Sequence, residues 1–513
     1  MKHILNFTYK SIFLLGILFY GWILAIDLFF SQTKYVCQNK HVLSNIKLLI
    51  IGIFLITTTA FLIKRFPEQT KVLAEKWKQH IKLFSIILLI VELIISYCIL
   101  FASGWDAGIV LGQADLIASG STKLNHDYYS WYPNNLLITF LYSLAYRLMG
   151  LLGIQFAGSV IIVFIQCILS VITGYFLYHI AENMFHNQTL SMLLWLIYAL
   201  WLGLLPWYTV TYSEPLAIFF PVFILYLYQC MEKQEKFYRN TALIGILSVI
   251  GFKLKPSTLI VSMAIFIILV LQLLDKKTRN FSLKKLVILI VTFTVTLGIF
   301  EQVDFAKQMG LKLDTNKEMP MTHFAMMGLS EKRNGIFDQK ELDYSLSFPN
   351  VQKRKEANIE MITKRLKSYG FSGLMKHMTK KTLTNFNDGA FTWGKEGDFF
   401  LIEIEKPNGP LSKALKNIYY NDGTCRIGFN TYMQMFLIVT LFGGILYALF
   451  RLHKRIPTDS DLIILLSLIG LFLFVSIFEA RARYIYTYVP FYLLMGIGGY
   501  KQLYHCLHKK KDN

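Results

Sequence analysis

Long apolar runs separated by charged islands follow one another along most of this chain. A run of about 17–25 apolar residues has the length of a helix that crosses the hydrocarbon core of a bilayer. By that criterion, membrane helices are predicted over 11–30, 45–63, 83–102, 133–150, 154–179, 190–205, 214–230, 241–253, 256–274, 284–301, 431–450, 461–479 and 484–501. The pattern therefore predicts an all-α polytopic membrane protein with about 12–14 membrane helices.

Lysine and arginine gather in short segments beside the apolar runs, which indicates the side of the membrane that each segment occupies. Segments expected in the cytoplasm are 64–82, 231–240, 275–285, 451–456 and the tail 501–513. Residues 103–131 and 302–430 are then extracytoplasmic, and both termini are cytoplasmic. Counting every run as a full crossing places 302–430 inside instead. An odd number of crossings is therefore required between 133 and 180, so one of the two runs there is re-entrant or split, or two helices have been merged.

Composition agrees with this class of protein. The chain is 54% hydrophobic and 16% charged, whereas soluble proteins average about 25% charged residues. Much of the net charge of +20 lies in short loops, as expected of a membrane protein, and the sequence contains no nucleic-acid-binding motif. Residues 11–30 are expected to anchor the chain, because no small-residue cleavage site follows them. Base rates argue against a disulfide between Cys37 and Cys425.

The apolar map divides the chain into four parts. They are an N-terminal hairpin with a basic loop (1–82), a membrane module (83–301), a small mixed extracytoplasmic domain (302–430), and C-terminal membrane helices with a basic tail (431–513). In the domain, 351–369 is predicted to be a surface helix. Its apolar residues at helical spacing are Val351, Ile359, Ile362 and Leu366. Gly370 is a helix stop signal, and a second helix is expected over 372–386.

Carboxylates recur at the outer ends of predicted spans. Asp106 follows the third run, between Gly104 and Gly108, which permit close backbone approach. Glu214 begins a later span in the sequence Tyr-Ser-Glu-Pro. Either residue could instead be a carboxylate that only stabilises a helix N-terminus.

Cations also lie at the outer face, against the usual bias of lysine and arginine toward the cytoplasm. Lys253 and Lys255 separate two short spans, and in an extended segment their side chains would point the same way. Arg481 and Arg483 lie at another outer boundary, and arginine binds phosphate through two parallel hydrogen bonds. The alternatives are lysines that reach from a helix end to the interface and a local pair of Glu479 with one arginine.

Glu92 lies in the middle of the third predicted span, where a carboxylate is a functional candidate by default. It precedes Asp106 by 14 residues, roughly 21 Å along a helix. The two carboxylates cannot share one site, so Glu92 is expected to have a structural partner, Arg147.

Carboxylates and cations from distant segments thus converge on the outer membrane surface. One reaction that needs this combination is sugar transfer from a polyprenyl phosphate to a hydroxyl. The leaving group is a phosphate, which cations stabilise without a general acid, and the acceptor hydroxyl needs one carboxylate as base. The lipid donor explains a site at the membrane edge.

With these motifs the chain resembles the GT-C fold glycosyltransferases, which include the protein O-mannosyltransferases and the aminoarabinose transferases, over most of residues 83–500. The resemblance rests on motifs rather than on close similarity. The matching motifs are Asp106 in the first outer loop, Tyr132-Pro133-Asn134-Asn135, Glu214, Lys255-Pro256, and two runs like those of a Gram-positive subgroup, 320–329 and 479–484. Ala107 stands where the mannosyltransferases have a second acidic residue, so the subfamily and any metal requirement stay open.

The resemblance implies an inverting glycosyltransferase in a bacterial cell membrane, with an extracytoplasmic active site and Asp106 as catalytic base. Candidate ligands of the donor phosphate are Lys253, Lys255, Arg481 and Arg483. Candidates that support the acceptor or a divalent cation are Glu214, His126, Asp127 and His323. The implied partners are a polyprenyl-phosphate-linked sugar, the lipid bilayer, and a cell-envelope glycan, teichoic acid or protein acceptor.

Two other functions fit parts of the pattern. An envelope polysaccharide polymerase also has many spans, a large outer loop and outer arginines, but it does not require the Trp-Asp-Ala-Gly sequence directly after a span. A lipid-linked sugar flippase or other transporter predicts an internal repeat and charged residues along a central pathway. The sequence has no such repeat, and only Glu92 is placed deep in a span.

Overall fold

The computed structural model describes residues 2–30, 39–452 and 457–509. Helices make up nearly all of its regular structure. Within the described residues, the strands form one short antiparallel pair, β1 (Phe101–Ala102) with β2 (Ile402–Glu403). The predicted all-α class is confirmed.

Every predicted apolar run lies on a helix. These helices are α1 (Lys2–Phe29), α2 (Asn45–Arg65), α3 (Pro67–Cys98), α6 (Leu136–Leu151), α7 (Gly158–Phe185), α8 (Gln188–Tyr198), α9 (Ser213–Ala217) with α10 (Phe219–Glu232), α11 (Phe237–Leu254), α12 (Leu259–Gln272), α13 (Arg279–Gln302), α19 (Arg426–Leu452), α20 (Asp459–Ile477) and α22 (Val489–Lys509). By length and composition, eight helices in the described part are long and apolar enough to cross a membrane. The polytopic class is therefore confirmed as well.

The basic segment 64–82 is mostly helical, although the sequence pattern suggested a loop. Helix α3 begins at Pro67, where proline suits the first helical turn because no amide hydrogen is needed there. It then continues through the lysines into the apolar run, with a kink at His80 (φ −111°, ψ 16°).

Other helices lie between the spans, and α17, with 36 residues, is the longest of them. They are α4 (Asp106–Ala118), α5 (His126–Trp131), α14 (Phe305–Gln308), α15 (Met321–Gly328), α16 (Gln339–Leu346), α17 (Val351–Phe386), α18 (Pro410–Tyr419) and α21 (Arg483–Tyr486). Helix α17 is interrupted at Gly370, whose φ of 54° and ψ of −166° are not helical. Glycine adopts this conformation readily, so the predicted stop and the second helix after it are confirmed.

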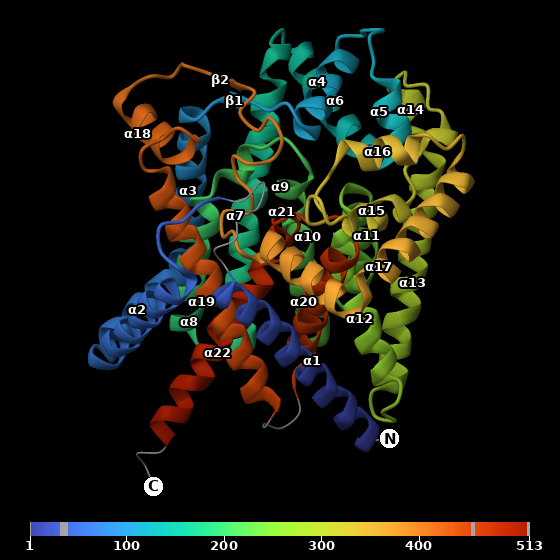
Figure 1. The fold of residues 1–513 in the computed structure, drawn as a ribbon. Helices are drawn as coiled ribbons and strands as arrows, with labels where there is room; N and C mark the ends of the chain where they lie inside the picture. The colour runs from blue at the N-terminus through green and yellow to red at the C-terminus, as the bar shows by residue number, and fades with distance from the viewer. Residues whose placement is uncertain (1, 31–38, 453–456, 510–513) are drawn as a thin grey trace.

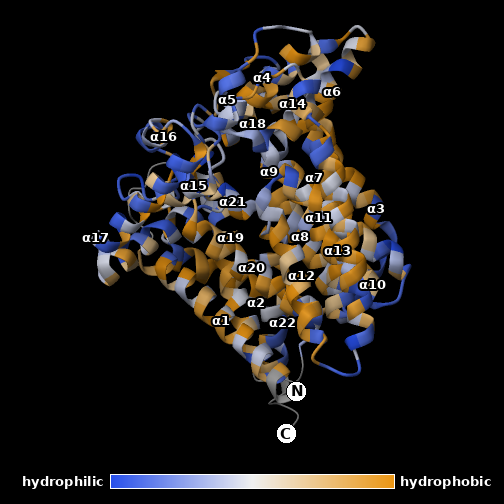
Figure 2. Cartoon of the chain, turned by 90° about the vertical axis from the view of Figure 1, so that its right-hand side faces the viewer, coloured by the Kyte–Doolittle hydropathy of each residue, from blue (hydrophilic) through white to orange (hydrophobic). Residues whose placement is uncertain are grey.

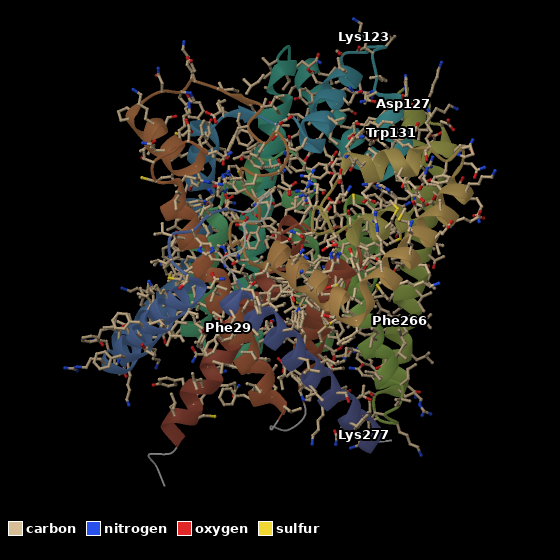
Figure 3. All side chains as sticks on the ribbon, in the orientation of Figure 1. Phe29, Lys123, Asp127, Trp131, Phe266 and Lys277 are labelled. Atoms are coloured by element: carbon tan, nitrogen blue, oxygen red, sulfur yellow. The ribbon has the colours of Figure 1, made fainter. Side chains whose placement is uncertain are left out.

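The two ends of the molecule carry different segments (Figure 1). The N-terminal end of α1 and the C-terminal end of α22 both lie at one end of the molecule, and α4, α5 and α14 lie at the other. Lys277 belongs to the first end, whereas Lys123 and Asp127 belong to the second (Figure 3). The basic loop 275–285 and the loop 103–131 are thus at opposite ends, as their charges suggest.

Helix α6 does not run from one end of the molecule to the other. Near its start, Asn135 donates to the Tyr128 hydroxyl (2.7 Å), which donates to Asp106 at the start of α4. Beyond its end, Gln155 donates to the Asp115 carboxylate late in α4 (2.9 Å). Helices α4 and α6 therefore lie side by side and parallel at one end (Figures 1 and 2). Of the two runs between 133 and 180, α7 is long and apolar enough to cross a membrane, and α6 is not among the helices that meet this criterion.

Residues 386–400 enter the core of the spanning helices. The indole N–H of Trp201 donates to the Gly389 carbonyl (2.9 Å), and that of Trp207 donates to the Ala390 carbonyl (3.2 Å). Trp393 is completely buried among aromatic neighbours. In Figure 2 the spanning helices are mostly hydrophobic. The connection between α13 and α19 therefore contributes to the membrane body itself.

Candidate active site

Asp106 is the first residue of α4, and residues 103–105 connect it to strand β1, which follows α3. Its carboxylate accepts hydrogen bonds from the hydroxyls of Tyr128 (3.1 Å) and Tyr212 (3.5 Å). Among the described residues, no cation lies within ion-pair distance of it. Burial raises the pKa of the Asp106 carboxyl above its ordinary value, while nearby Arg483 and Tyr128 act in the opposite direction. A carboxylate in this setting is a stronger base than one in water.

Glu214 joins two cations from distant segments. One of its oxygens, Oε1, lies 2.7 Å from Lys255 Nζ and 2.5 Å from Arg483 Nη1. The glutamate side chain has no exposed surface, and each cationic side chain is 8% exposed. Such buried charges persist only when they are paired, so this triad fixes α9, α21 and the α11–α12 junction to one another.

Glu396 is a member of this cluster that the sequence did not reveal. Its carboxylate lies 3.3 Å from Arg483 Nε and 3.5 Å from Arg481 Nη1. The segment reaches this place because Gly397 lies against Trp105, and a Cβ atom there would come within 3.0 Å of the Trp105 Cβ atom. The sequence signal is a glutamate between two glycines, Gly394 and Gly397.

The cluster contains equal numbers of cations and of glutamates paired with them, and the Asp106 carboxylate is an additional negative charge. The cations are Lys255, Arg481 and Arg483, and the glutamates paired with them are Glu214, Glu396 and Glu479. The Arg483 guanidinium also lies 4.9 Å from the centre of the Trp105 ring and 5.5 Å from that of Tyr212. These two rings connect the cation network to Asp106. The structure thus brings together Asp106, Glu214, Lys255, Arg481 and Arg483, five of the predicted site residues.

The backbone explains why only one of the two neighbouring lysines joins the cluster. Helix α11 continues through Leu254, and Lys255 is extended (φ −156°, ψ 112°) before Pro256, as proline requires of the residue before it. Lys253 is therefore helical and pairs with Glu301 (2.5 Å) at a more exposed position. The prediction that the two lysines point the same way is wrong, because the segment between them is not extended.

Three other predicted residues have separate partners. Asp127 pairs with Lys317 (2.8 Å) on the surface. His126 Nδ1 accepts from the backbone N–H of Lys312 (3.1 Å), so both residues tie α5 to residues 312–317. His323 is buried, and its Nδ1 atom lies 2.8 Å from the Ser345 hydroxyl oxygen. Burial lowers the pKa of the His323 imidazole to about 4.

Lys381 supports the segment that carries the arginines. Its ammonium donates to the carbonyls of Ser476 (2.8 Å) and Phe478 (2.6 Å) at the end of α20, just before Glu479. A cation at a helix C-terminus is favourable because carbonyl groups are unpaired there. Burial lowers the pKa of the Lys381 amine to about 7.

The deep carboxylate of Glu92 has a different partner from the one predicted. Its Oε1 atom accepts from the Ser170 hydroxyl (2.8 Å) on α7, whereas Arg147 is exposed on α6. The prediction of an Arg147 partner is wrong because α6 lies at one end of the molecule and not beside the middle of α3.

In the described part of the chain, no group of three or more histidine, cysteine, aspartate or glutamate side chains is placed to hold one metal ion. Cys425 is a free thiol, and Cys37, its conceivable disulfide partner, lies outside the described residues.

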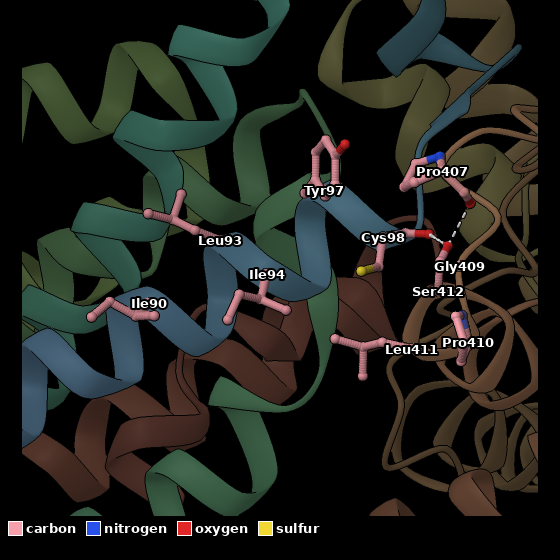
Figure 4. A pocket seen from close by; sticks show the side chains of 10 residues that line it. All are labelled: Ile90, Leu93, Ile94, Tyr97, Cys98, Pro407, Gly409, Pro410, Leu411 and Ser412. Atoms are coloured by element: carbon pink, nitrogen blue, oxygen red, sulfur yellow. Dashed lines mark hydrogen bonds between the residues drawn. The ribbon is translucent and has the colours of Figure 1, made fainter.

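An apolar groove of about 550 Å³ lies beside the C-terminal end of α3 (Figure 4). Its lining comprises Ile90, Leu93, Ile94, Tyr97, Cys98, Pro407, Gly409, Pro410, Leu411 and Ser412. The Ser412 hydroxyl bridges the two walls through the carbonyls of Cys98 (2.6 Å) and Pro407 (2.7 Å). The groove shares no residue with the charged cluster.

Comparison with solved structures finds a similar chain in the archaeal oligosaccharyltransferase AglB from Archaeoglobus fulgidus, in complex with an inhibitory peptide and a dolichol-phosphate. The match has 11% identity and a TM-score of 0.43, and covers 84% of this chain and 52% of that one. The apo form of the Archaeoglobus fulgidus oligosaccharyltransferase matches with 11% identity and a TM-score of 0.40, over 83% and 51%. This chain thus spans about half the length of those structures.

No curated protein sequence matches the chain. One family model does, and it covers residues 1–502. Its description is that of a conserved hypothetical integral membrane protein. The match extends over nearly the whole sequence, from α1 into α22. The chain therefore belongs to this family of integral membrane proteins.

Proposed function

We propose that this protein is an inverting glycosyltransferase that moves a sugar from a polyprenyl-phosphate donor to a hydroxyl of a cell-envelope acceptor. The observation that carries the proposal is the Asp106 cluster. It holds one carboxylate without an ion pair beside three cations, Lys255, Arg481 and Arg483, from distant parts of the chain. A base next to a cluster of cations is what transfer from a phosphate leaving group requires.

Asp106 is assigned the role of general base. The acceptor oxygen forms a bond to the anomeric carbon while the bond from that carbon to the phosphate oxygen breaks. The hydroxyl proton passes to the Asp106 carboxylate, and polyprenyl phosphate leaves with the bonding electrons. A single displacement of this kind inverts the anomeric carbon. The hydrogen bonds from Tyr128 and Tyr212 hold the carboxylate in place before the acceptor arrives.

The cations are assigned to the donor phosphate. Glu214 and Glu396 fix Lys255, Arg481 and Arg483 in advance, so little reorganisation is needed when negative charge develops on the leaving oxygen. Arginine suits this role because its planar group can hold two phosphate oxygens together. The paired glutamates also explain how three cations can be buried in one cluster.

We assign the cluster to the extracytoplasmic side of a bacterial cell membrane, with both termini in the cytoplasm. The support is the distribution of charge: the basic loop around Lys277 lies at the end opposite Lys123 and Asp127. A polyprenyl-phosphate sugar in the outer leaflet could then reach the cluster from the membrane. On this assignment, the module 83–301 and the helices of 431–513 build the site together with Glu396 from the segment 302–430.

The test is the variant Asp106→Asn, assayed in proteoliposomes with radiolabelled polyprenyl-phosphate sugars and isolated cell envelope as acceptor. Loss of the base should lower transfer by about 10²–10⁴-fold. Asp115→Asn, on the same helix but hydrogen-bonded to Gln155, is the matched control and should retain activity. Undiminished transfer by a correctly inserted Asp106→Asn protein would contradict the proposal. Envelope glycan analysis of a deletion strain then identifies the product by the sugar that is missing.

A further inference from the structure

The first half of α17, residues 351–371, presents its apolar side away from the rest of the protein. Ile359 is 51% exposed and Leu366 is 41% exposed, and Ile362 lies between them at helical spacing. Phe371, just beyond the break at Gly370, is 81% exposed. A soluble surface helix normally turns such a stripe toward the core. Here the described part of the chain leaves Ile359, Leu366 and Phe371 exposed and covers Ile362 only in part.

The side of α17 that packs on the protein is polar. Arg354 and Asn358 are 1% and 0% exposed. Arg354 donates hydrogen bonds to the backbone carbonyls of Ser345, Phe348, Asn316 and Glu318. Asn358 accepts from the Ser345 hydroxyl (3.0 Å). These contacts fix the rotation of the helix, so its apolar stripe cannot turn inward without breaking them.

Lysines lie on the exposed surface of the same half of the helix. They are Lys353, Lys355, Lys364 and Lys367, against two glutamates, Glu356 and Glu360. A helix with large apolar residues on one strip and lysines beside it is typical of peptides that lie in the plane of a membrane surface. A water-soluble polyanion would need the lysines but would not need the exposed isoleucine, leucine and phenylalanine.

The second half of α17 fixes this helix to the spanning helices. The Trp22 indole N–H on α1 donates to the Thr382 hydroxyl (2.9 Å), and Lys381 binds the C-terminal carbonyls of α20. Both α1 and α20 are long and apolar enough to cross a membrane. Helix α17 thus leaves the bundle beside spanning helices and forms an outer edge of the molecule (Figure 2).

We propose that residues 351–371 lie on the membrane surface at the end that carries the Asp106 cluster. Ile359, Leu366 and Phe371 contact lipid chains there, and the flanking lysines contact anionic lipid headgroups. The contact is continuous with the bilayer that surrounds α1 and α20. It is independent of the proposed glycosyl transfer, because it follows from the exposed apolar stripe and its lysines.

The experiment uses the full-length protein in nanodiscs with a fluorescent amino acid placed at one position by codon suppression. Position 366 reports on the stripe, and position 360, an exposed glutamate one residue after Ile359 and therefore turned about 100° away from it, is the matched control. Brominated lipid chains should quench the probe at 366 several-fold more than the probe at 360, and aqueous iodide should show the reverse order. Equal iodide quenching at both positions, without quenching by lipid, would overturn the proposal.

Hydrogen exchange of the unmodified protein provides a second measurement that no substitution can disturb. Amides of 355–371 should exchange more slowly in nanodiscs that contain anionic lipid than in purely zwitterionic ones. Exchange that is insensitive to lipid charge but slows when soluble polyphosphate is added would also overturn the proposal, and would identify this helix as a site for an anionic polymer. Amides of α16, on the side of α17 away from the stripe, serve as the internal reference.

Discussion

Residues 351–371 and 386–400 belong to the same connection between α13 and α19, yet they place their apolar side chains in opposite directions. The first segment buries Arg354 and Asn358 and exposes Leu366. The second buries Phe391 and Trp393 within the spanning helices. The difference shows that apolar side chains turn toward whichever apolar surroundings are nearest. For 386–400 these are the spanning helices, and for 351–371 they are, on our proposal, lipid. It also gives the segments separate roles, because only 386–400 extends to the charged cluster.

The largest expected effect is that of replacing Glu396, the residue through which the segment 386–400 reaches the charged cluster. If sugar transfer survived this substitution, the two segments would no longer differ in their roles. Glu396→Ala leaves Arg481 and Arg483 buried with fewer carboxylates, and removing one partner of such a pair typically costs about 3–5 kcal/mol. We expect sugar transfer to fall by at least about 10²-fold, since this energy is lost from the site. Glu403→Ala, an exposed glutamate on the same connection, is the control. Equal activity of the two variants in proteoliposomes would exclude Glu396 from the site.

The buried tryptophan provides a test of stability. Trp393→Ala should destabilise the protein by about 3–5 kcal/mol, because a large aromatic side chain is removed from a packed core. Its N–H also donates to the Tyr419 carbonyl (3.2 Å), which would lose that partner. Phe371→Ala, at an exposed position of α17, should leave the thermal midpoint in detergent nearly unchanged. Similar shifts in both variants would remove the distinction between the two segments.

The pH dependence of activity should arise from the cluster and not from α17. As a base, Asp106 works only when deprotonated, so transfer should fall about tenfold per pH unit once the pH is below its pKa. Burial raises that pKa, so the loss should begin above the range of an ordinary aspartate. Lys367→Gln on the surface of α17 should not move the profile. An activity that stays flat down to the ordinary aspartate range would contradict the role of Asp106.

The smallest expected effect is that of a polar residue in the exposed stripe. Leu366→Ser should change stability in detergent by less than about 0.5 kcal/mol, as is usual for surface positions. In nanodiscs it should weaken the contact of α17 with lipid, seen as faster hydrogen exchange in 355–371. A large loss of stability in detergent would mean that protein, and not lipid, covers this side chain.

Much of the fold could be predicted from the sequence, because each long apolar run lies on a helix. The helical extension of α3 back to Pro67 was missed because its lysines resemble those of a loop. The charge pattern indicated that the two runs between 133 and 180 are not both full crossings, but it did not single out α6, because the composition of α6 does not differ from that of a span. Its position depends on contacts with α4, which a single run of sequence does not contain.

The candidate site was partly predictable for a different reason. Asp106, Glu214, Lys255 and the two arginines lie where charge is unusual, at the ends of apolar runs, so position alone singled them out. Glu396 lies in a polar stretch where a glutamate is ordinary, and it reaches the cluster only because Gly397 fits against Trp105. The stripe of α17 was recognised correctly as helical, but the sequence could not tell which side of the helix would meet the protein.

The shared oxygen of Glu214 has a consequence for biogenesis. A membrane chain is made and inserted from its N-terminus, so Glu214 and Lys255 enter the bundle before Arg483 has been synthesised. The glutamate can hold both cations only after α21 arrives. A chain that ends before α21 would therefore keep Glu214 paired with Lys255 alone. The network is thus completed by the last part of the chain to be made, so we expect truncation before α21 to impair assembly of the membrane body.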